Sequence, residues 1–136
     1  MYPSQQCSML FALLFAAVVG CGKSELSPLT GTVTFDGKPL SSGIIAFQNV
    51  ADGPAGHASV QPDGRYVART GNQVGLRPGE YQISIVAYEP LVPTSSGREP
   101  MPKMVTPKRF ARPETSGLRY TLTESGGAFD ISLSSE

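Results

Sequence analysis

The chain has 136 residues, and its eleven basic and eleven acidic side chains give a formal net charge of zero. A chain of this length supports one folded domain with a single hydrophobic core. Because a neutral chain has no excess charge with which to attract phosphates, nucleic-acid binding is not expected. Two cysteines and one histidine leave little material for a disulfide framework or a zinc site.

The first predicted element is an apolar run from Met9 to Val19, which is followed closely by Cys21. The run is about 11 residues long, which suits the core of an export signal and is too short to span a bilayer. Small residues before a cysteine resemble the lipobox of bacterial lipoproteins. This resemblance implies a signal peptide at 1–20, lipid attachment at Cys21 and a lipidated tether at 21–28. An ordinary secretory signal and a buried core segment are the alternatives.

Cleavage before Cys21 would also determine whether either cysteine thiol remains free in the mature chain. Cys7 would leave with the signal peptide and Cys21 would carry the lipid, so no disulfide is expected in the folded part. The lipid would attach the domain to a membrane of the bacterial cell envelope, where it would face the periplasm or the cell surface.

Residues 29–136 are predicted to form an all-β domain. They show short alternating runs separated by Gly and Pro, without the apolar spacing of an amphipathic helix. Seven runs are predicted to be strands: Gly31–Phe35, Gly43–Gln48, His57–Gln61, Arg65–Thr70, Tyr81–Tyr88, Leu118–Thr123 and Ala128–Leu133. Seven strands at this spacing predict a Greek-key β-sandwich, in which each strand has one packed face and one solvated face.

Three tight turns are predicted where Gly supplies the backbone conformation that a turn requires. They lie at Asp36–Gly37, Pro62–Gly64 and Pro78–Gly79. A tyrosine that enters a strand after a turn often donates its hydroxyl back to the turn backbone, and we expect this role for Tyr81.

The connection from residue 89 to residue 117 differs from the rest of the domain. It contains six prolines, which remove amide donors and exclude a regular ladder. Connections this long in a compact domain are usually functional or disordered. Its basic residues and its one aromatic residue are the candidate binding residues: Arg98, Lys103, Lys108, Arg109, Phe110 and Arg112. A solvated loop without a binding role is the alternative.

Four segments combine strand patterns with tight turns: Gly31–Leu40, Gly43–Phe47, Asp63–Tyr66 and Gly75–Tyr81. Together they resemble the transthyretin-like or carboxypeptidase regulatory-like β-sandwich family, and in particular the small lipoproteins of this type in planctomycete bacteria. The resemblance implies a β-sandwich that acts as an accessory or adhesive module. It implies no chemistry.

Candidate catalytic and metal-binding residues do not form a usable pattern. One branch of the transthyretin fold hydrolyses a purine-breakdown product with several histidines, whereas this chain has only His57. A lone histidine cannot supply paired acid and base roles, and no serine lies in a Gly-x-Ser-x-Gly motif. Asp36, Asp52 and Asp63 lie in predicted turns without the spacing of a calcium loop. We therefore expect no catalytic residue, no metal, no cofactor and no enzymatic activity.

Three functional hypotheses remain. The first is a non-enzymatic module of the cell envelope that is anchored through Cys21 and binds an envelope protein or glycan. The second is a carbohydrate or small-ligand binding domain that uses the loop at 89–117, although the chain has no Trp for sugar stacking. The third is a divergent transthyretin-like hydrolase, which would lack its catalytic residues.

Overall fold

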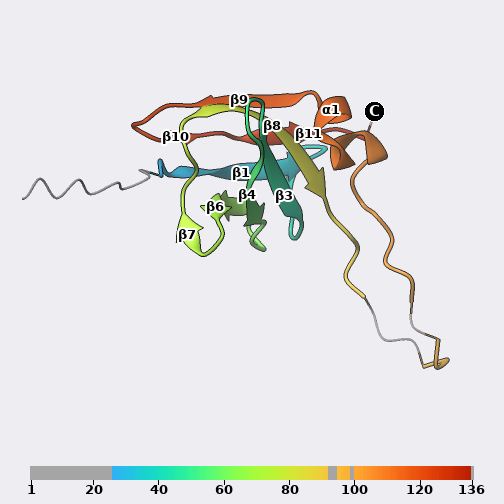
Figure 1. The fold of residues 1–136 in the computed structure, drawn as a ribbon. Helices are drawn as coiled ribbons and strands as arrows, with labels where there is room; N and C mark the ends of the chain where they lie inside the picture. Colours follow the sequence, from blue (N-terminus) through green and yellow to red (C-terminus); the bar gives the residue numbers. More distant parts are fainter. Residues whose placement is uncertain (1–25, 92–94, 99, 136) are drawn as a thin grey trace, which may run out of the picture.

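A computed structural model describes residues 26–91, 95–98 and 100–135, which form an all-β sandwich of two sheets (Figure 1). The predictions for Cys21 and for the signal peptide lie outside the described residues. The larger sheet contains β3 (Ile44–Asn49), β4 (Gly53–Ser59), β6 (Arg69–Thr70), β7 (Gln73–Val74), β8 (Gly79–Val86) and β9 (Leu118–Leu122). The smaller sheet contains β1 (Leu29–Phe35), β2 (Lys38–Pro39), β5 (Arg65–Val67), β10 (Gly127–Ala128) and β11 (Ile131–Leu133).

The larger sheet is antiparallel and has the strand order β7-β6-β4-β3-β8-β9. Within it, β3 pairs with β4 and β4 pairs with β6, while β5 of the smaller sheet lies between β4 and β6 along the chain; β8 returns to pair with β3. A fourth strand that returns beside the first is the defining feature of a Greek key. The two sheets confirm the predicted all-β sandwich, and the return of β8 beside β3 is the feature that it shares with the predicted Greek key.

The smaller sheet is built around β1. One edge of β1 pairs antiparallel with β5 and β2, and the other edge pairs parallel with β10 and β11. The parallel pairing joins Val33 to Ile131 and Phe35 to Leu133, so the first and last strands of the described chain lie side by side.

The described residues form eleven strands where seven were predicted, because two predicted strands are broken and the short strands β2 and β7 were not predicted. The predicted strand Arg65–Thr70 divides at Ala68, where the chain passes from the smaller sheet to the larger one. The Ala68 amide donates to Leu29 O, while its carbonyl accepts from Gly75 N, so this residue forms a corner between the sheets. The predicted strand Ala128–Leu133 divides into β10 and β11 at residues 129–130.

The core lies between the two sheets and follows the predicted alternation. Its largest aromatic side chains come from both sheets, and the Phe47 ring lies 6.2 Å from Tyr66 and 6.4 Å from Tyr81. The Tyr81 hydroxyl donates to Arg77 O at 2.6 Å, which confirms the predicted bond back to the turn. At the first predicted turn, Asp36 and Gly37 have φ values of 49° and 83° and connect β1 to β2.

Candidate functional site

The first half of the predicted loop projects from the sandwich as an arm, which we define by its described residues, 89–91, 95–98 and 100–103. Figure 1 shows it leaving the body beyond β8 and returning to the two short helical turns. Its base is closed by hydrogen bonds from Glu89 N to Lys103 O, at 2.9 Å, and from Val105 N to Ala87 O, at 2.8 Å. The Lys103 ammonium also lies 3.9 Å from the Glu89 carboxylate. The arm therefore has a fixed origin on the sandwich.

Large exposed apolar side chains gather on the arm and at its base. On the arm, Leu91 and Met101 are 60% and 91% exposed. At the base, Tyr88 is 46% exposed, and Ile44 on the neighbouring strand is 62% exposed. Ile44 pairs with Val86, two residues before Tyr88, so these side chains lie on the same face of the larger sheet. The end of the sandwich that carries the arm therefore exposes several large apolar side chains, which can contact another molecule.

The second half of the predicted loop packs against the sandwich, which differs from the expectation of one open loop. It forms η1 (Lys108–Ala111) and α1 (Pro113–Ser116). Proline is tolerated at the first position of a helical turn, so Pro113 starts α1 instead of breaking the chain. The Ser116 hydroxyl donates to Ile83 O, and Phe110 is only 5% exposed. Burial of this aromatic ring explains why the segment returns to the core.

The predicted binding residues do not converge on one site. Arg98 and Lys103 lie on the arm, whereas Lys108, Arg109 and Arg112 lie on or beside the helical turns. The Arg109 guanidinium lies 4.6 Å from the centre of the Phe110 ring and donates to Ser134 O at 3.2 Å and to Ser134 Oγ at 3.1 Å. Arg109 thus covers the buried ring and holds the segment after β11. Because Phe110 is buried, its ring is not available to stack on a sugar.

The opposite end of the sandwich receives the N-terminal part of the described chain. Ser27 exchanges two backbone hydrogen bonds with Leu76, at 2.7 and 3.0 Å, and its hydroxyl donates to Glu124 O. We call this the tether end. The strand β8 begins near it at Gly79 and runs to Val86 at the base of the arm. Eight strand residues span roughly 25 Å, so the tether end and the arm lie at opposite ends of the sandwich (Figure 1).

The tether end contains a hollow of about 280 Å³, which we call the tether-end hollow. It lies where the β3–β4 turn, the end of β6 and the turn before β8 meet. Its lining residues are Asn49, Asp52, Ala55, Thr70, Arg77, Pro78 and Tyr81. From the sequence, Asp52 and the segment around Arg77 were predicted only to lie in turns. Arg77, a charged residue between Leu76 and Pro78, was the one feature of the sequence that pointed to this hollow.

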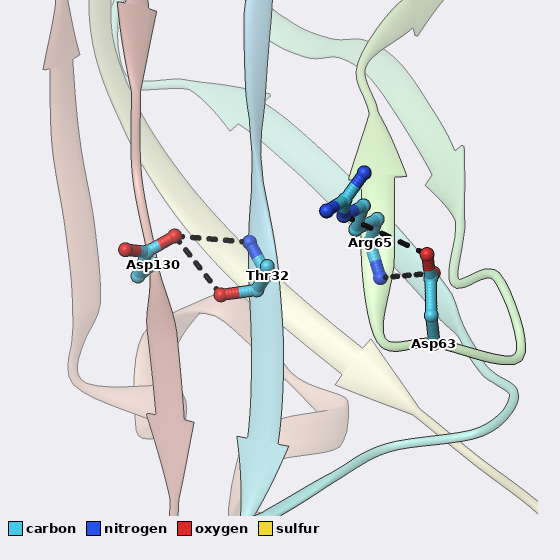
Figure 2. A network of polar contacts seen from close by, with 4 residues as sticks. All are labelled: Thr32, Asp63, Arg65 and Asp130. Atoms are coloured by element: carbon cyan, nitrogen blue, oxygen red, sulfur yellow. Dashed lines mark hydrogen bonds and ion pairs between the residues drawn. The ribbon is translucent and has the colours of Figure 1, made fainter.

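Two pairs of residues make exposed polar contacts on the smaller sheet (Figure 2). The Asp130 carboxylate accepts from Thr32 N and Oγ1, and the Asp63 carboxylate accepts from Arg65 N at 3.0 Å. Beneath it, Tyr66 donates its hydroxyl to Phe129 O at 2.5 Å. Burial raises the pKa of Tyr66 above its ordinary value, and the negative charge of Asp130 adds to the effect. Tyr66 therefore remains a neutral hydrogen-bond donor.

The described residues offer little for catalysis. His57 is exposed on β4 and lines a shallow hollow of about 350 Å³ on the outer face of the larger sheet. Within residues 26–91, 95–98 and 100–135, no three His, Cys, Asp or Glu side chains are grouped so that they could hold a metal ion. In the same part of the chain, no helix is long and apolar enough to cross a membrane.

The comparisons with known proteins found a structural neighbour but no matching family. No protein-family model and no curated protein matches the sequence. The chain is similar to the crystal structure of a DUF3823 family protein from Bacteroides ovatus ATCC 8483, with a TM-score of 0.45 and 18% sequence identity. The matched region covers 79% of this chain and 44% of that one, so this chain spans less than half the length of its neighbour.

Proposed function

We propose that this protein is a non-enzymatic, lipid-anchored module of the bacterial cell envelope that presents the arm to a protein partner. The observation that carries the proposal is the placement of the tether end and the arm at opposite ends of the sandwich. If the chain is attached to a membrane near its N-terminus, this placement points the arm away from that membrane.

The anchoring step rests on the sequence before the domain. Cys21 follows an apolar run and small residues, as in a lipobox, and lies five residues before Leu26. Five extended residues reach at most about 17 Å, so the sandwich would stay close to the membrane. Bacterial lipoproteins carry several acyl chains, which makes such an anchor stable. The resemblance to transthyretin-like lipoproteins supports an accessory role without chemistry.

A protein partner fits the arm better than a glycan does. Met, Tyr and Arg are enriched at protein interfaces, and Met101, Tyr88 and Arg98 are exposed on the arm or at its base. Phe110, the aromatic residue of the predicted loop, is buried and cannot stack on a sugar, which leaves Tyr88 as the exposed aromatic side chain at the base of the arm. Leu91 adds an exposed apolar side chain to the arm, from which a bound partner would exclude water.

The anchor is tested by comparing Cys21→Ala with Cys7→Ala in a bacterial host, using intact mass and membrane fractionation. Cys7 is a matched control because it lies in the predicted signal peptide. We expect wild type and Cys7→Ala to carry lipid and to sediment with membranes, and Cys21→Ala to carry none. Wild-type protein without lipid would refute the proposal.

Partner binding is tested by chemical cross-linking in intact cells, with the double variant Leu91→Ser, Met101→Ser beside Val74→Ser. Val74 is 50% exposed on β7, away from the arm, and controls for the loss of an exposed apolar residue. We expect the arm variant to lose a cross-linked protein that wild type and Val74→Ser retain. Equal cross-linking in all three proteins would show that the arm is not the binding surface.

A further inference from the structure

The tether-end hollow contains two oppositely charged side chains that are not engaged elsewhere. Asp52 and Arg77 are both exposed and line the same hollow. Among the described residues, the ion pairs are Asp63 with Arg65, Glu89 with Lys103, and Glu80 with Arg119. Neither Asp52 nor Arg77 uses its side chain in a hydrogen bond to another residue of the described chain. Both charges are therefore available to a ligand.

A buried amide adds a third polar group. Asn49 is 9% exposed, and its Oδ1 accepts from Ala51 N at 2.9 Å and from Asp52 N at 3.1 Å. These bonds fix the orientation of the side chain and occupy its acceptor. Within the described part of the chain, no hydrogen bond uses its Nδ2 as donor, which leaves an N–H pair for a ligand in the hollow.

The other polar wall groups are already bonded within the protein. The Thr70 hydroxyl donates to Gly75 O at 2.8 Å, and the Tyr81 hydroxyl donates to Arg77 O at 2.6 Å. The second bond fixes the backbone that carries the Arg77 side chain. The hollow therefore has a rigid base with a guanidinium, an amide donor and a carboxylate at its opening.

These groups define the chemistry of the ligand. Arg77 and Asn49 donate hydrogen bonds to an anionic group, and a guanidinium pairs well with the oxygens of a phosphate. Asp52 accepts hydrogen bonds from an ammonium group. The ligand is therefore a small zwitterion that carries an anionic group and a primary ammonium group. A hollow of about 280 Å³ has room for a group of this size.

The position of the hollow identifies the source of the zwitterion. Arg77 directly follows Leu76, which pairs with Ser27 at the tether end. If Cys21 is lipidated, the hollow lies on the membrane side of the sandwich, within reach of lipid headgroups. We propose that the tether-end hollow binds the phosphoethanolamine headgroup of the membrane that anchors the chain. This inference rests on the proposed anchoring through Cys21.

The first test uses water-soluble headgroups and the unlipidated Cys21→Ala chain. Calorimetry compares glycerophosphoethanolamine with glycerophosphocholine, whose quaternary ammonium has no N–H to donate, and with glycine. We expect glycerophosphoethanolamine to bind at least tenfold more tightly than either. Adding Arg77→Gln or Asp52→Asn should weaken its binding tenfold or more, whereas Arg65→Gln, which removes an exposed arginine of the smaller sheet that does not line the hollow, should not.

The second test identifies the source by sedimentation with vesicles. The same chains are mixed with vesicles of phosphatidylcholine alone or with added phosphatidylethanolamine. Since all chains share one N-terminus, differences between them report on the hollow. We expect phosphatidylethanolamine to increase binding, and Arg77→Gln or Asp52→Asn to abolish the increase. Unchanged thermal unfolding of these variants shows that they are folded.

Three results would overturn the inference: hollow variants that bind like wild type, equal binding of glycine and glycerophosphoethanolamine, or equal sedimentation with both kinds of vesicle. The failures of the two proposals can be told apart. An unlipidated wild type with intact headgroup binding refutes the anchor alone. A lipidated wild type without headgroup binding refutes the hollow alone.

Discussion

Asp130 Oδ1 accepts two hydrogen bonds from Thr32, one from the backbone amide and one from the hydroxyl, and both are 3.0 Å long. They lie at the break between β10 and β11, where the parallel ladder along β1 is interrupted (Figure 2). The carboxylate supplies the acceptor that a continuous strand would have offered from its backbone. A side chain thus closes a gap in the smaller sheet.

We expect Asp130→Ala to lower the free energy of unfolding by about 1–2 kcal/mol, because it removes two exposed hydrogen bonds to a charged acceptor. Asp130→Asn keeps an acceptor oxygen and should lose less. Urea denaturation measures both. Ser132→Ala is the control, since Ser132 makes only a 3.4 Å contact with Thr34 on the same face. Equal losses for Asp130→Ala and Ser132→Ala would contradict this role.

Gly31 is required by the close approach of β1 to the same break. A Cβ at this position would collide with Phe129 O and would lie 2.9 Å from the Tyr66 hydroxyl. Because a backbone atom cannot move aside cheaply, Gly31→Ala should cost about 3 kcal/mol or more. Gly37→Asn is the comparison, since nothing lies within 4 Å of a Cβ there and Asn tolerates its positive φ. Thermal unfolding should show a large loss for the first variant and a small one for the second.

Tyr66→Phe should change the pH dependence of stability in the alkaline range. The folded protein raises the pKa of Tyr66 above its ordinary value of 10.0, mainly through burial. The unfolded chain therefore loses this proton first, and the contribution of Tyr66 to stability falls as the pH rises above 10. At neutral pH the variant should be about 1 kcal/mol less stable through loss of the bond to Phe129 O.

The difference between wild type and Tyr66→Phe should therefore narrow as the pH rises above 10. Urea denaturation from pH 7 to pH 11 measures it. A constant difference over this range would show that the pKa of Tyr66 is not raised by folding.

Phe110→Ala should destabilise the protein by about 3–5 kcal/mol, because it removes a buried aromatic side chain. The neighbouring Lys108→Ala should have little effect, since Lys108 is exposed. Guanidinium denaturation of both variants compares the two positions. Similar small losses would indicate that the segment from residue 104 to residue 117 is not packed against the core.

The fold could be predicted from the sequence because alternation and turn residues act over short distances. Each predicted run overlaps an observed strand, and Tyr81 makes the predicted bond to its turn. The breaks at Ala68 and at residues 129–130 could not be predicted in this way. They depend on which sheet the chain joins at these residues. The hydrogen-bond partners there, such as Leu29 and Thr32, lie far away in the sequence.

The candidate sites were harder to predict for the same reason. The composition of residues 89–117 indicated one basic loop, but the burial of Phe110 divides it into an arm and a packed segment. Asn49, Asp52 and Arg77 come from two turns that meet only in the folded sandwich. Their chemistry becomes visible only when the tertiary structure brings them together.

The parallel pairing of β1 with β11 has a consequence for how the chain acquires its structure. Val33 pairs with Ile131, which lies 98 residues later in the chain, so this edge of β1 has no partner until Ile131 is present. Long-range pairings of this kind make folding slow. During synthesis, the smaller sheet cannot be completed until Ile131–Leu133 have left the ribosome. If the chain is exported before it folds, as proposed above, this delay would keep it unfolded during export until its last strand has been synthesised.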